Sequence, residues 1–540
     1  MRLPTVVAPL AVVAAVLGVT SYAVQSPPRD RPLVSADSAH LKWTTERLDA
    51  LLAESWAAQG LSPAGPANDL TVLRRLTLAL VGTVPSLEEI RRFEADTRPD
   101  RLTHWTAQLL DDVRFADYFA ERLARAYVGV EGGQFILFRR DRFIDWLSEQ
   151  LRQHRPYDEL VRDMIATDGV WTDKPAVNFV TAAYANDVFD ENKLAGRTVR
   201  AFLGQRIDCA QCHDHPFAHW KQSEFEGLAA CFGKTRMSII GVDDGRKTPY
   251  EIEDRKTLEK REVQPAVPFG SEWLPENGSP RDRLAAWVTH KENRRFDRAA
   301  ANRVWGLMFG KPFLADRPID DLPDPNDPAV SEQNRVLDLL ADDFRIHGRD
   351  LRRLVQIIAA SNAFRLDSRA SASMSSESVA GGCHWEVFPL VRLRPEQVVG
   401  SMLQASSIRT IDRNSHLFTR ALRFFRERDF VEDFGDPGEN ELGERVGTVP
   451  QALLRMNGEL QNDLTKPNPF NATTRIANNA GDPAVCVEVA YLVCLSRRPT
   501  PEEAEYFTKQ IADQSKKQRD NAVADLIWSL FNSTEFSWNH

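Results

Sequence analysis

The sequence has few of the features that mark several large protein classes. Only six of its 540 residues are cysteine, which excludes a disulfide-dense scaffold. Lys and Arg number 68 against 77 Asp and Glu, and the resulting net charge of −9 argues against a nucleic-acid binder, whose domains are usually basic. The chain has no Walker loop, nucleophile elbow or dinucleotide-binding glycine pattern. A hydrophobic content of 42% and a charged content of 27% instead predict an ordinary globular protein.

Long apolar stretches are also absent after the N-terminus. Residues 1–26 combine Arg2, an apolar run and the small-x-small triplet Ser21-Tyr22-Ala23, which predicts a secretory signal peptide. The alternative is an uncleaved membrane anchor, because residues 3–24 just reach the length of about 20 that spans a bilayer. Residues 27–40 are expected to form a linker. We therefore expect an exported protein, periplasmic or extracellular, which contacts a membrane only through this segment if it is retained.

Most of the remaining chain repeats its apolar residues at helical spacing. The pattern predicts helices over residues 41–56 and 69–81, the second with Arg74 and Arg75 on its polar side and with Gly82 as its end. Ser86 can cap the helix that follows through its side-chain oxygen. The two acidic residues in the first turn of that helix also favour a helix N-terminus. The same period predicts helices over 115–128, 135–151, 281–290, 299–309, 336–344, 351–360, 485–495, 501–513 and 521–531. The fold class is therefore mainly α.

Residues 235–269 differ from the helical parts on either side. Short alternating pieces with Asp-Gly and Pro punctuation predict a small β-containing insertion or linker here. It would join an N-terminal helical domain, residues 41–234, to a C-terminal helical domain, residues 270–540.

Residues 368–382 are low in complexity and are expected to form a loop. Cys486 and Cys494 lie eight residues apart on one predicted helix, too far apart for a mutual disulfide.

One short motif carries a chemical hypothesis. Residues 208–220 read DCAQCHDHPFAHW, in which Cys209, Cys212 and His213 form Cys-x-x-Cys-His, the attachment pattern of c-type haem. Two thiols at this spacing can each add to one haem vinyl group, and the adjacent imidazole then becomes the proximal iron ligand. The motif predicts haem c as the cofactor. For the sixth iron position we consider His219 or Met237, or an open site.

Three other interpretations of this motif remain open. The two thiolates with His213, His215 or His219 could form a tetrahedral zinc site, although ligands so close in sequence would strain one tetrahedron. Cys209 and Cys212 could also form a redox disulfide, although no thioredoxin-like βαβ pattern surrounds them. Finally, the cluster could be purely structural.

Several stretches carry a resemblance to a known family: residues 73–89, 201–217, 302–310, 392–397, 450–458 and 531–536. They resemble a planctomycete cytochrome-like secreted family, in which domain of unknown function 1549 is followed by domain of unknown function 1553. The resemblance covers nearly all of the chain after the leader. It implies that the family's Cys-x-x-Cys-His element corresponds here to Cys209, Cys212 and His213.

The leading hypothesis is an exported c-type haem protein that transfers electrons or supports an oxidoreductase. Its partner would be a redox protein or another extracytoplasmic protein that the sequence does not identify. A secreted structural or binding protein with a zinc or purely structural Cys/His site is the alternative. A polysaccharide-acting hydrolase comes third, because no pair of catalytic carboxylates can be chosen from sequence spacing. Whether the protein is an enzyme stays open.

Overall fold

The computed structural model describes most of the chain after the leader. The described residues are 38–130, 138–185, 188–216, 218–238, 241–253, 258–325, 331–369, 384–407, 409–412, 429–435, 438, 442–443, 447–468, 471–512 and 514–540. The predicted signal or anchor, most of the predicted linker and most of the loop predicted at 368–382 lie outside them. Residues 39–540 form one unit by their contacts.

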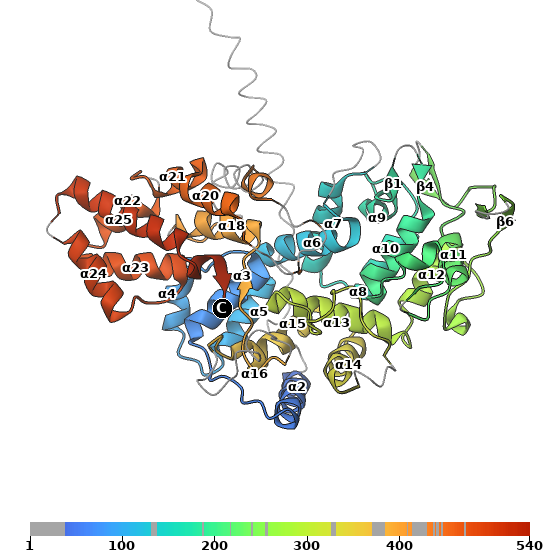
Figure 1. Cartoon of the computed structure of the whole chain (residues 1–540), viewed down its shortest axis with the longest axis horizontal. Coiled ribbons are helices and arrows are strands. Elements are labelled where there is room, and N and C mark those ends of the chain that lie inside the picture. The colour runs from blue at the N-terminus through green and yellow to red at the C-terminus, as the bar shows by residue number, and fades with distance from the viewer. Residues whose placement is uncertain are drawn as a thin grey trace, which may run out of the picture. The chain divides into compact units, whose positions relative to one another are not determined.

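Helices dominate the first half of the described chain (Figure 1). They are α2 (Ser38–Ala58), α3 (Asp69–Val81), α4 (Leu87–Ala95), α5 (Arg101–Asp111), α6 (Val113–Val128), α7 (Arg140–Arg152), α8 (Tyr157–Ala166), η1 (Pro175–Val177), α9 (Asn178–Thr181), α10 (Glu191–Leu203), η2 (Asp208–Gln211) and α11 (Gln222–Ala230). A first two-stranded sheet pairs β1 (Tyr184–Ala185) with β2 (Val188–Phe189).

The expected β-containing insertion is present. β3 (Arg236–Ser238) pairs antiparallel with β4 (Gly241–Asp243), and β5 (Glu251–Glu253) pairs antiparallel with β6 (Lys260–Glu262). Gly169 bridges to Val242, so the first hairpin is attached to the helical part of the chain. The insertion is thus two separate hairpins and not a continuous sheet.

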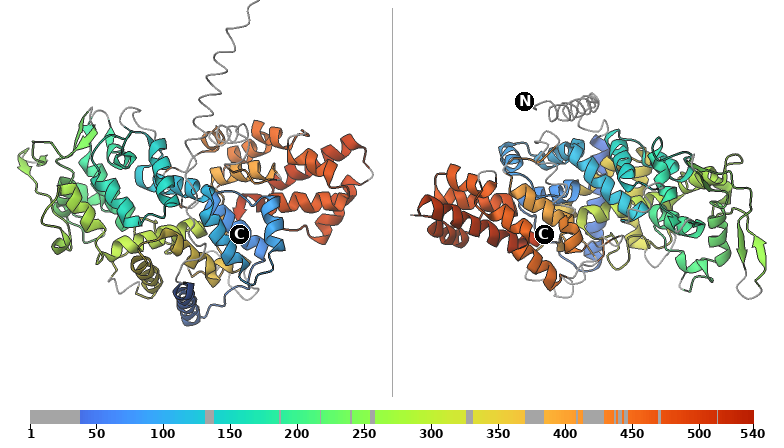
Figure 2. Two further views of the ribbon diagram at one scale, coloured as in Figure 1. Left: turned by 180° about the vertical axis from the view of Figure 1, so that it is seen from behind. Right: turned by 90° about the horizontal axis from the view of Figure 1, so that it is seen from above.

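The second half is again helical (Figure 2). Its elements are η3 (Ser271–Trp273), α12 (Pro280–Val288), α13 (Arg294–Phe309), α14 (Ser331–Ile346), α15 (Leu351–Ala360), α16 (Asn362–Arg365), β7 (Val391–Arg392), α18 (Pro395–Ala405), α20 (Val449–Asn457), α21 (Glu459–Thr465), α22 (Ala472–Asn479), α23 (Pro483–Leu495), α24 (Pro501–Ile511), α25 (Lys516–Asn532), η5 (Glu535–Ser537) and β8 (Trp538–Asn539). β7 pairs with β8. The mainly α prediction is confirmed.

Helix boundaries follow local capping chemistry. The side chain of Asn68 accepts a hydrogen bond from the Leu70 N–H at the start of α3, and Gly82 ends that helix at φ 73°. Ser86 and Glu89 form the reciprocal capping box of α4. Cys486 and Cys494 both lie in α23, buried and without a disulfide, as expected.

The hydrophobic core does not divide at the β insertion. The larger cluster of buried residues includes Phe202 of α10 and Trp305 of α13, which come from opposite sides of residues 235–269. A second cluster gathers α18, α23 and α25, together with Leu78 and Val84 from the N-terminal part. The helices before and after the insertion therefore share a core, and the domain limits drawn from sequence stay predictions.

Arg74 and Arg75 differ from the expectation that they face solvent. Both are fully buried, because backbone carbonyls far away in sequence accept their guanidinium hydrogens. Arg74 donates to the Cys494 carbonyl at 3.0 Å, and Arg75 donates to the Leu366 carbonyl at 2.7 Å. Burial lowers the pKa of Arg74 to about 10 and that of Arg75 to about 9.

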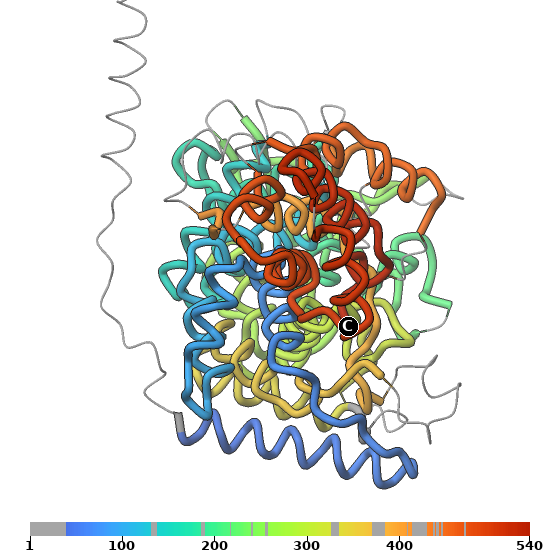
Figure 3. The backbone as a smooth tube through the Cα atoms, turned by 90° about the vertical axis from the view of Figure 1, so that its left-hand side faces the viewer, coloured from blue at the N-terminus to red at the C-terminus, as the bar shows by residue number. Residues whose placement is uncertain are grey.

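α2 is the first helix of the described chain, and Figure 3 follows its length. It is fastened at several points: the Asp49 carboxylate accepts the Asn362 N–H at 2.7 Å, and Trp56 Nε1 donates to the His384 carbonyl at 2.7 Å. Of the helices in the described ranges, none has both the length and the apolar character needed to cross a membrane.

Candidate functional site

The Cys-x-x-Cys-His motif begins just after α10. Gly204 ends α10 in the left-handed region at φ 62°, where a Cβ would come within 3.1 Å of Leu322 and 3.2 Å of Ala299. The chain then forms the 3-10 turn η2, which leads into Cys212 and His213. This abrupt change of direction places the motif at the surface, next to α11.

The geometry of η2 sets Cys209 and Cys212 one turn apart. A 3-10 helix has three residues per turn, so side chains at positions i and i+3 lie one above the other. Cys209 and Cys212 stand in that relation, and the Cys212 N–H bonds to the Cys209 carbonyl at 3.5 Å. Both thiols are exposed and no disulfide joins them, whereas Ile207 and Ala210 are buried on the inner side. Both sulfur atoms are therefore accessible to solvent, one turn of chain apart.

His213 is exposed, and its hydrogen bond determines its tautomer. Its Nδ1 lies 2.7 Å from the backbone carbonyl oxygen of Asp214, which can only accept. Nδ1 therefore carries the hydrogen, and Nε2 carries the lone pair. A backbone carbonyl on one imidazole nitrogen is the arrangement that orients metal-binding histidines in many proteins. Nε2 is therefore the nitrogen that His213 would offer to a metal.

The loop after the motif is fixed at its far end. The His215 N–H donates to the Trp220 carbonyl at 2.8 Å. The Asp214 carboxylate accepts from the Gln222 N–H at 3.0 Å and from Lys221 Nζ at 2.9 Å, at the start of α11. These bonds, the Gln222 N–H first, lower the pKa of Asp214. Trp220 is buried, so the loop is anchored.

The predicted sixth ligands come from two different elements. His219 is exposed within the loop, and its ring lies 4.5 Å from that of Trp220. Met237 is half-buried on β3 opposite Val242 and packs against the larger core. His215 is also half-buried. His219 and His215 thus belong to the same surface loop as the motif, and Met237 belongs to the hairpin. Which of them binds iron stays a prediction.

A close group of side chains of metal-ligating type occurs elsewhere. Across the described ranges, the one group of three or more His, Cys, Asp or Glu side chains whose ligand atoms all lie within 4.8 Å of one another is His40, Asp343 and His347. A zinc ion at the Cys209 loop would therefore need its ligands to move together. This second group was not expected from the sequence. Only the four-residue spacing of Asp343 and His347 could have indicated it, because His40 is about 300 residues away.

Two protein-family models match this chain. A sequence model described as a protein of unknown function (DUF1549, PSCyt2) matches residues 47–237, and a second (DUF1553, PSD1) matches residues 280–511. The chain belongs to the family that combines these two domains. No curated protein and no solved structure matches it. The resemblance noted from the sequence motifs is confirmed, including the order of the domains.

The two matched ranges lie on either side of most of the β insertion. The DUF1549 domain contains the Cys-x-x-Cys-His motif and ends within β3, and the DUF1553 domain begins with α12. The interval between them contains most of the β insertion. His40 precedes the DUF1549 match, whereas Asp343 and His347 lie within the DUF1553 match.

Proposed function

We propose that this DUF1549–DUF1553 protein is an exported c-type haem protein that transfers electrons or supports an oxidoreductase. Cys209 and Cys212 would hold the haem covalently, and His213 would bind its iron through Nε2. The observation that carries the proposal is the arrangement of the motif: two exposed thiols one 3-10 turn apart, followed by an imidazole whose Nδ1 is already engaged.

The chemistry of the motif's donor groups supports this cofactor. Each thiol would add across one vinyl group, so that sulfur bonds to one vinyl carbon and the thiol hydrogen ends on the other. Both thiols are exposed, so a porphyrin can approach them without disrupting the core. The neighbouring buried Trp220 holds the loop in place and keeps the motif at the surface. His219 or Met237 is the proposed sixth ligand.

Export is part of the proposal, because c-type haem is attached outside the cytoplasm. Its support is the charged, apolar and small-residue pattern of residues 1–26. A fusion of this segment to an alkaline phosphatase that is active only after export would test it directly. Enzyme activity would support export, and inactive fusion protein retained in the cytoplasm would contradict it.

Covalent haem attachment is the decisive test. The full chain is produced in a host with cytochrome c maturation machinery, and denaturing gels are stained for haem. We expect staining of the parent and its loss in the Cys209→Ala/Cys212→Ala variant. Cys231→Ala is the matched control, since this thiol is buried against the Gly227 carbonyl. His213→Ala should alter the visible spectrum of the bound haem.

The same preparation separates the alternative function. An unstained parent, made beside a reference cytochrome that does stain, would contradict the haem proposal. One equivalent of zinc without iron would then favour a secreted binding or structural protein. Its ligands would be Cys209, Cys212 and a histidine of the loop such as His213 or His215. Loss of that zinc in the double cysteine variant would assign it to the loop.

A further inference from the structure

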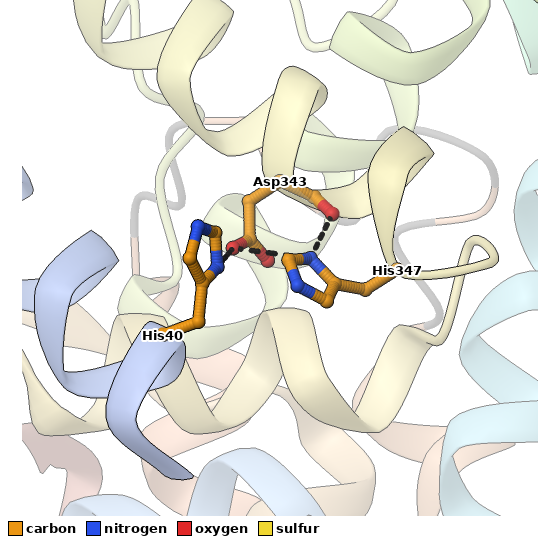
Figure 4. Close-up of side chains that lie close together, drawn as sticks. All are labelled: His40, Asp343 and His347. Atoms are coloured by element: carbon orange, nitrogen blue, oxygen red, sulfur yellow. Dashed lines mark hydrogen bonds and ion pairs between the residues drawn. The ribbon is translucent and has the colours of Figure 1, made fainter. Parts of the chain in front are cut away.

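A second cluster of ligating side chains lies away from the Cys-x-x-Cys-His loop. It joins His40 in the first turn of α2, Asp343 near the end of α14 and His347 just beyond that end (Figure 4). The Nδ1 atoms of both histidines lie 3.4 Å from Asp343 Oδ1, and the two ring centroids are 4.7 Å apart. Three side chains of two ligand types common at metal centres, imidazole and carboxylate, therefore lie close together.

The helices explain why these residues meet. Asp343 and His347 are four residues apart, so both side chains lie on one face of the α14 turn. His40 and Thr44 have the same spacing in α2, and the Thr44 hydroxyl donates to Asp343 Oδ1 at 2.7 Å. One turn of α2 thus faces one turn of α14. A helical pair with a third ligand from a distant element is a common way to build a metal site.

The carboxylate is held in a fixed orientation by groups around it. Arg353 donates from Nε to Asp343 Oδ2 at 2.8 Å and from Nη2 to Oδ1 at 2.9 Å. Asp343 is therefore an oriented ligand with hydrogen-bonded support, as metal-binding carboxylates usually are.

The imidazoles are placed to supply nitrogen ligands. His347 Nδ1 donates to the Asp343 backbone carbonyl at 2.8 Å, so the nitrogen that His347 would offer a metal is Nε2 and not the Nδ1 that lies 3.4 Å from Asp343 Oδ1. His40 Nδ1 faces Arg353 Nη2 at 3.2 Å and accepts from it. A metal at this nitrogen would replace that one contact, and Arg353 would keep its two bonds to Asp343. His40 is 39% exposed, which gives an ion a path from solvent.

The charges of Asp343 and Arg353 indicate which class of metal ion this group would prefer. The Arg353 guanidinium already offsets the Asp343 charge, so little net negative charge remains for hard cations such as Ca²⁺ and Mg²⁺, which prefer oxygen ligands. Neutral imidazole nitrogens suit Zn²⁺, Co²⁺ and Ni²⁺. We propose that His40, Asp343 and His347 bind a zinc-class divalent ion that joins the first turn of α2 to the end of α14.

Zinc binding to purified full-length protein tests this proposal. Cys209 and Cys212 are replaced by Ser, which removes the thiols of the other site. After treatment with a chelator, Zn²⁺ is titrated by calorimetry, and bound zinc is measured after desalting. We expect one equivalent of bound zinc and a raised melting temperature, because an ion that binds only the folded state stabilises it. Mg²⁺ should leave the melting temperature unchanged.

Histidine variants in the same background locate the ion. His40→Ala and His347→Ala should each weaken zinc binding at least tenfold, and the double variant should retain none. His104→Ala is the matched control, since His104 is a half-buried histidine of α5 whose Nε2 pairs with Gln108 and which lies outside the cluster. His40→Gln preserves a polar side chain of similar size, so weak binding with an unchanged circular dichroism spectrum would show loss of a ligand.

Cobalt gives a second readout. Co²⁺ in this site should give visible bands of a nitrogen- and oxygen-ligated ion, and these bands should disappear in the double histidine variant. No zinc bound to the folded parent would overturn the proposal. So would zinc binding that the double histidine variant retains at the parent affinity. Asp343 itself is kept, because its removal would leave the buried Arg353 charge uncompensated.

Discussion

Glu396 provides a quantitative test of how the two DUF domains are held together. It lies in α18 of the DUF1553 domain and forms an ion pair with Arg122 of α6, in the DUF1549 domain. Arg394 Nε lies 2.9 Å from the same carboxylate oxygen. All three side chains are buried, with at most 7% of each exposed. We predict that Glu396→Gln, a change of similar volume, strongly destabilises the fold.

The magnitude follows from the electrostatics of the site. Burial alone would raise the pKa of Glu396, but Arg122, Arg394 and Arg125 outweigh it and lower the pKa from 4.5 to about 2. A tenfold change in proton affinity is worth about 1.4 kcal/mol, so the ionised form gains about 3 kcal/mol on folding. Breaking a buried ion pair typically costs about 3–5 kcal/mol. We therefore expect a loss of about 3 kcal/mol in the free energy of unfolding at pH 7.

The pH dependence gives the sign of the effect. Because the folded pKa is depressed, this stabilisation is fully present above the unfolded pKa of 4.5 and is lost as pH falls toward 2. The parent and Glu396→Gln should therefore differ by a constant amount from pH 6 to 8 and converge below pH 4.5. Urea unfolding, followed by circular dichroism, measures both curves.

A matched control and a refuting result complete the experiment. Glu149→Gln removes an exposed carboxylate paired with Arg152, and it should change the free energy of unfolding by less than about 0.5 kcal/mol. A Glu396→Gln loss no larger than that of the control would refute the electrostatic reasoning. So would a difference that stays constant down to pH 3.

Two further predictions concern α2 and the thiols. Burial raises the pKa of Asp49 to about 6, so ionised Asp49 destabilises the fold as pH rises through 4 to 6. Since this carboxyl is partly exposed, Asp49→Asn should gain only about 1 kcal/mol at pH 7 and flatten the melting temperature between pH 4 and 6. A lower melting temperature at pH 7 would contradict this. In native haem-free protein, a thiol reagent should modify Cys209 and Cys212 before Cys231, whose burial raises the pKa to about 12. Peptide mass mapping over time checks the order, and early modification of Cys231 would contradict it.

Helices and hairpins were predictable where residues close together in sequence, such as caps and glycine stops, determine their limits. The α3 helix was expected at residues 69–81 and forms there, because apolar periodicity and the Gly82 stop agree. The helix expected from residue 485 begins at Pro483, since Asp482 caps it and proline suits the first helical position. The short alternating pieces of residues 235–269 likewise indicated the hairpins.

Long-range partners account for the clearest difference from expectation. Periodicity assigns Arg74 and Arg75 to a polar face, yet both are fully buried. Carbonyl oxygens of Cys494 and Leu366 satisfy them, and the Arg75 guanidinium lies 3.7 Å from the Phe388 ring centroid. These partners lie about 290 to 420 residues away in sequence, so a pattern read over one helix cannot contain them.

The two candidate sites show the same contrast. Cys209, Cys212 and His213 are adjacent in sequence, and a single 3-10 turn is enough to align them. His40 meets Asp343 and His347 only because α2 packs on α14, which no local spacing reveals. It follows that a metal found in this protein cannot be assigned from its Cys-x-x-Cys-His motif alone. Zinc that is lost in the histidine variants but kept in the cysteine variants would belong to the α2–α14 pair. Covalently attached haem, with its iron, would belong to the Cys209–His213 turn.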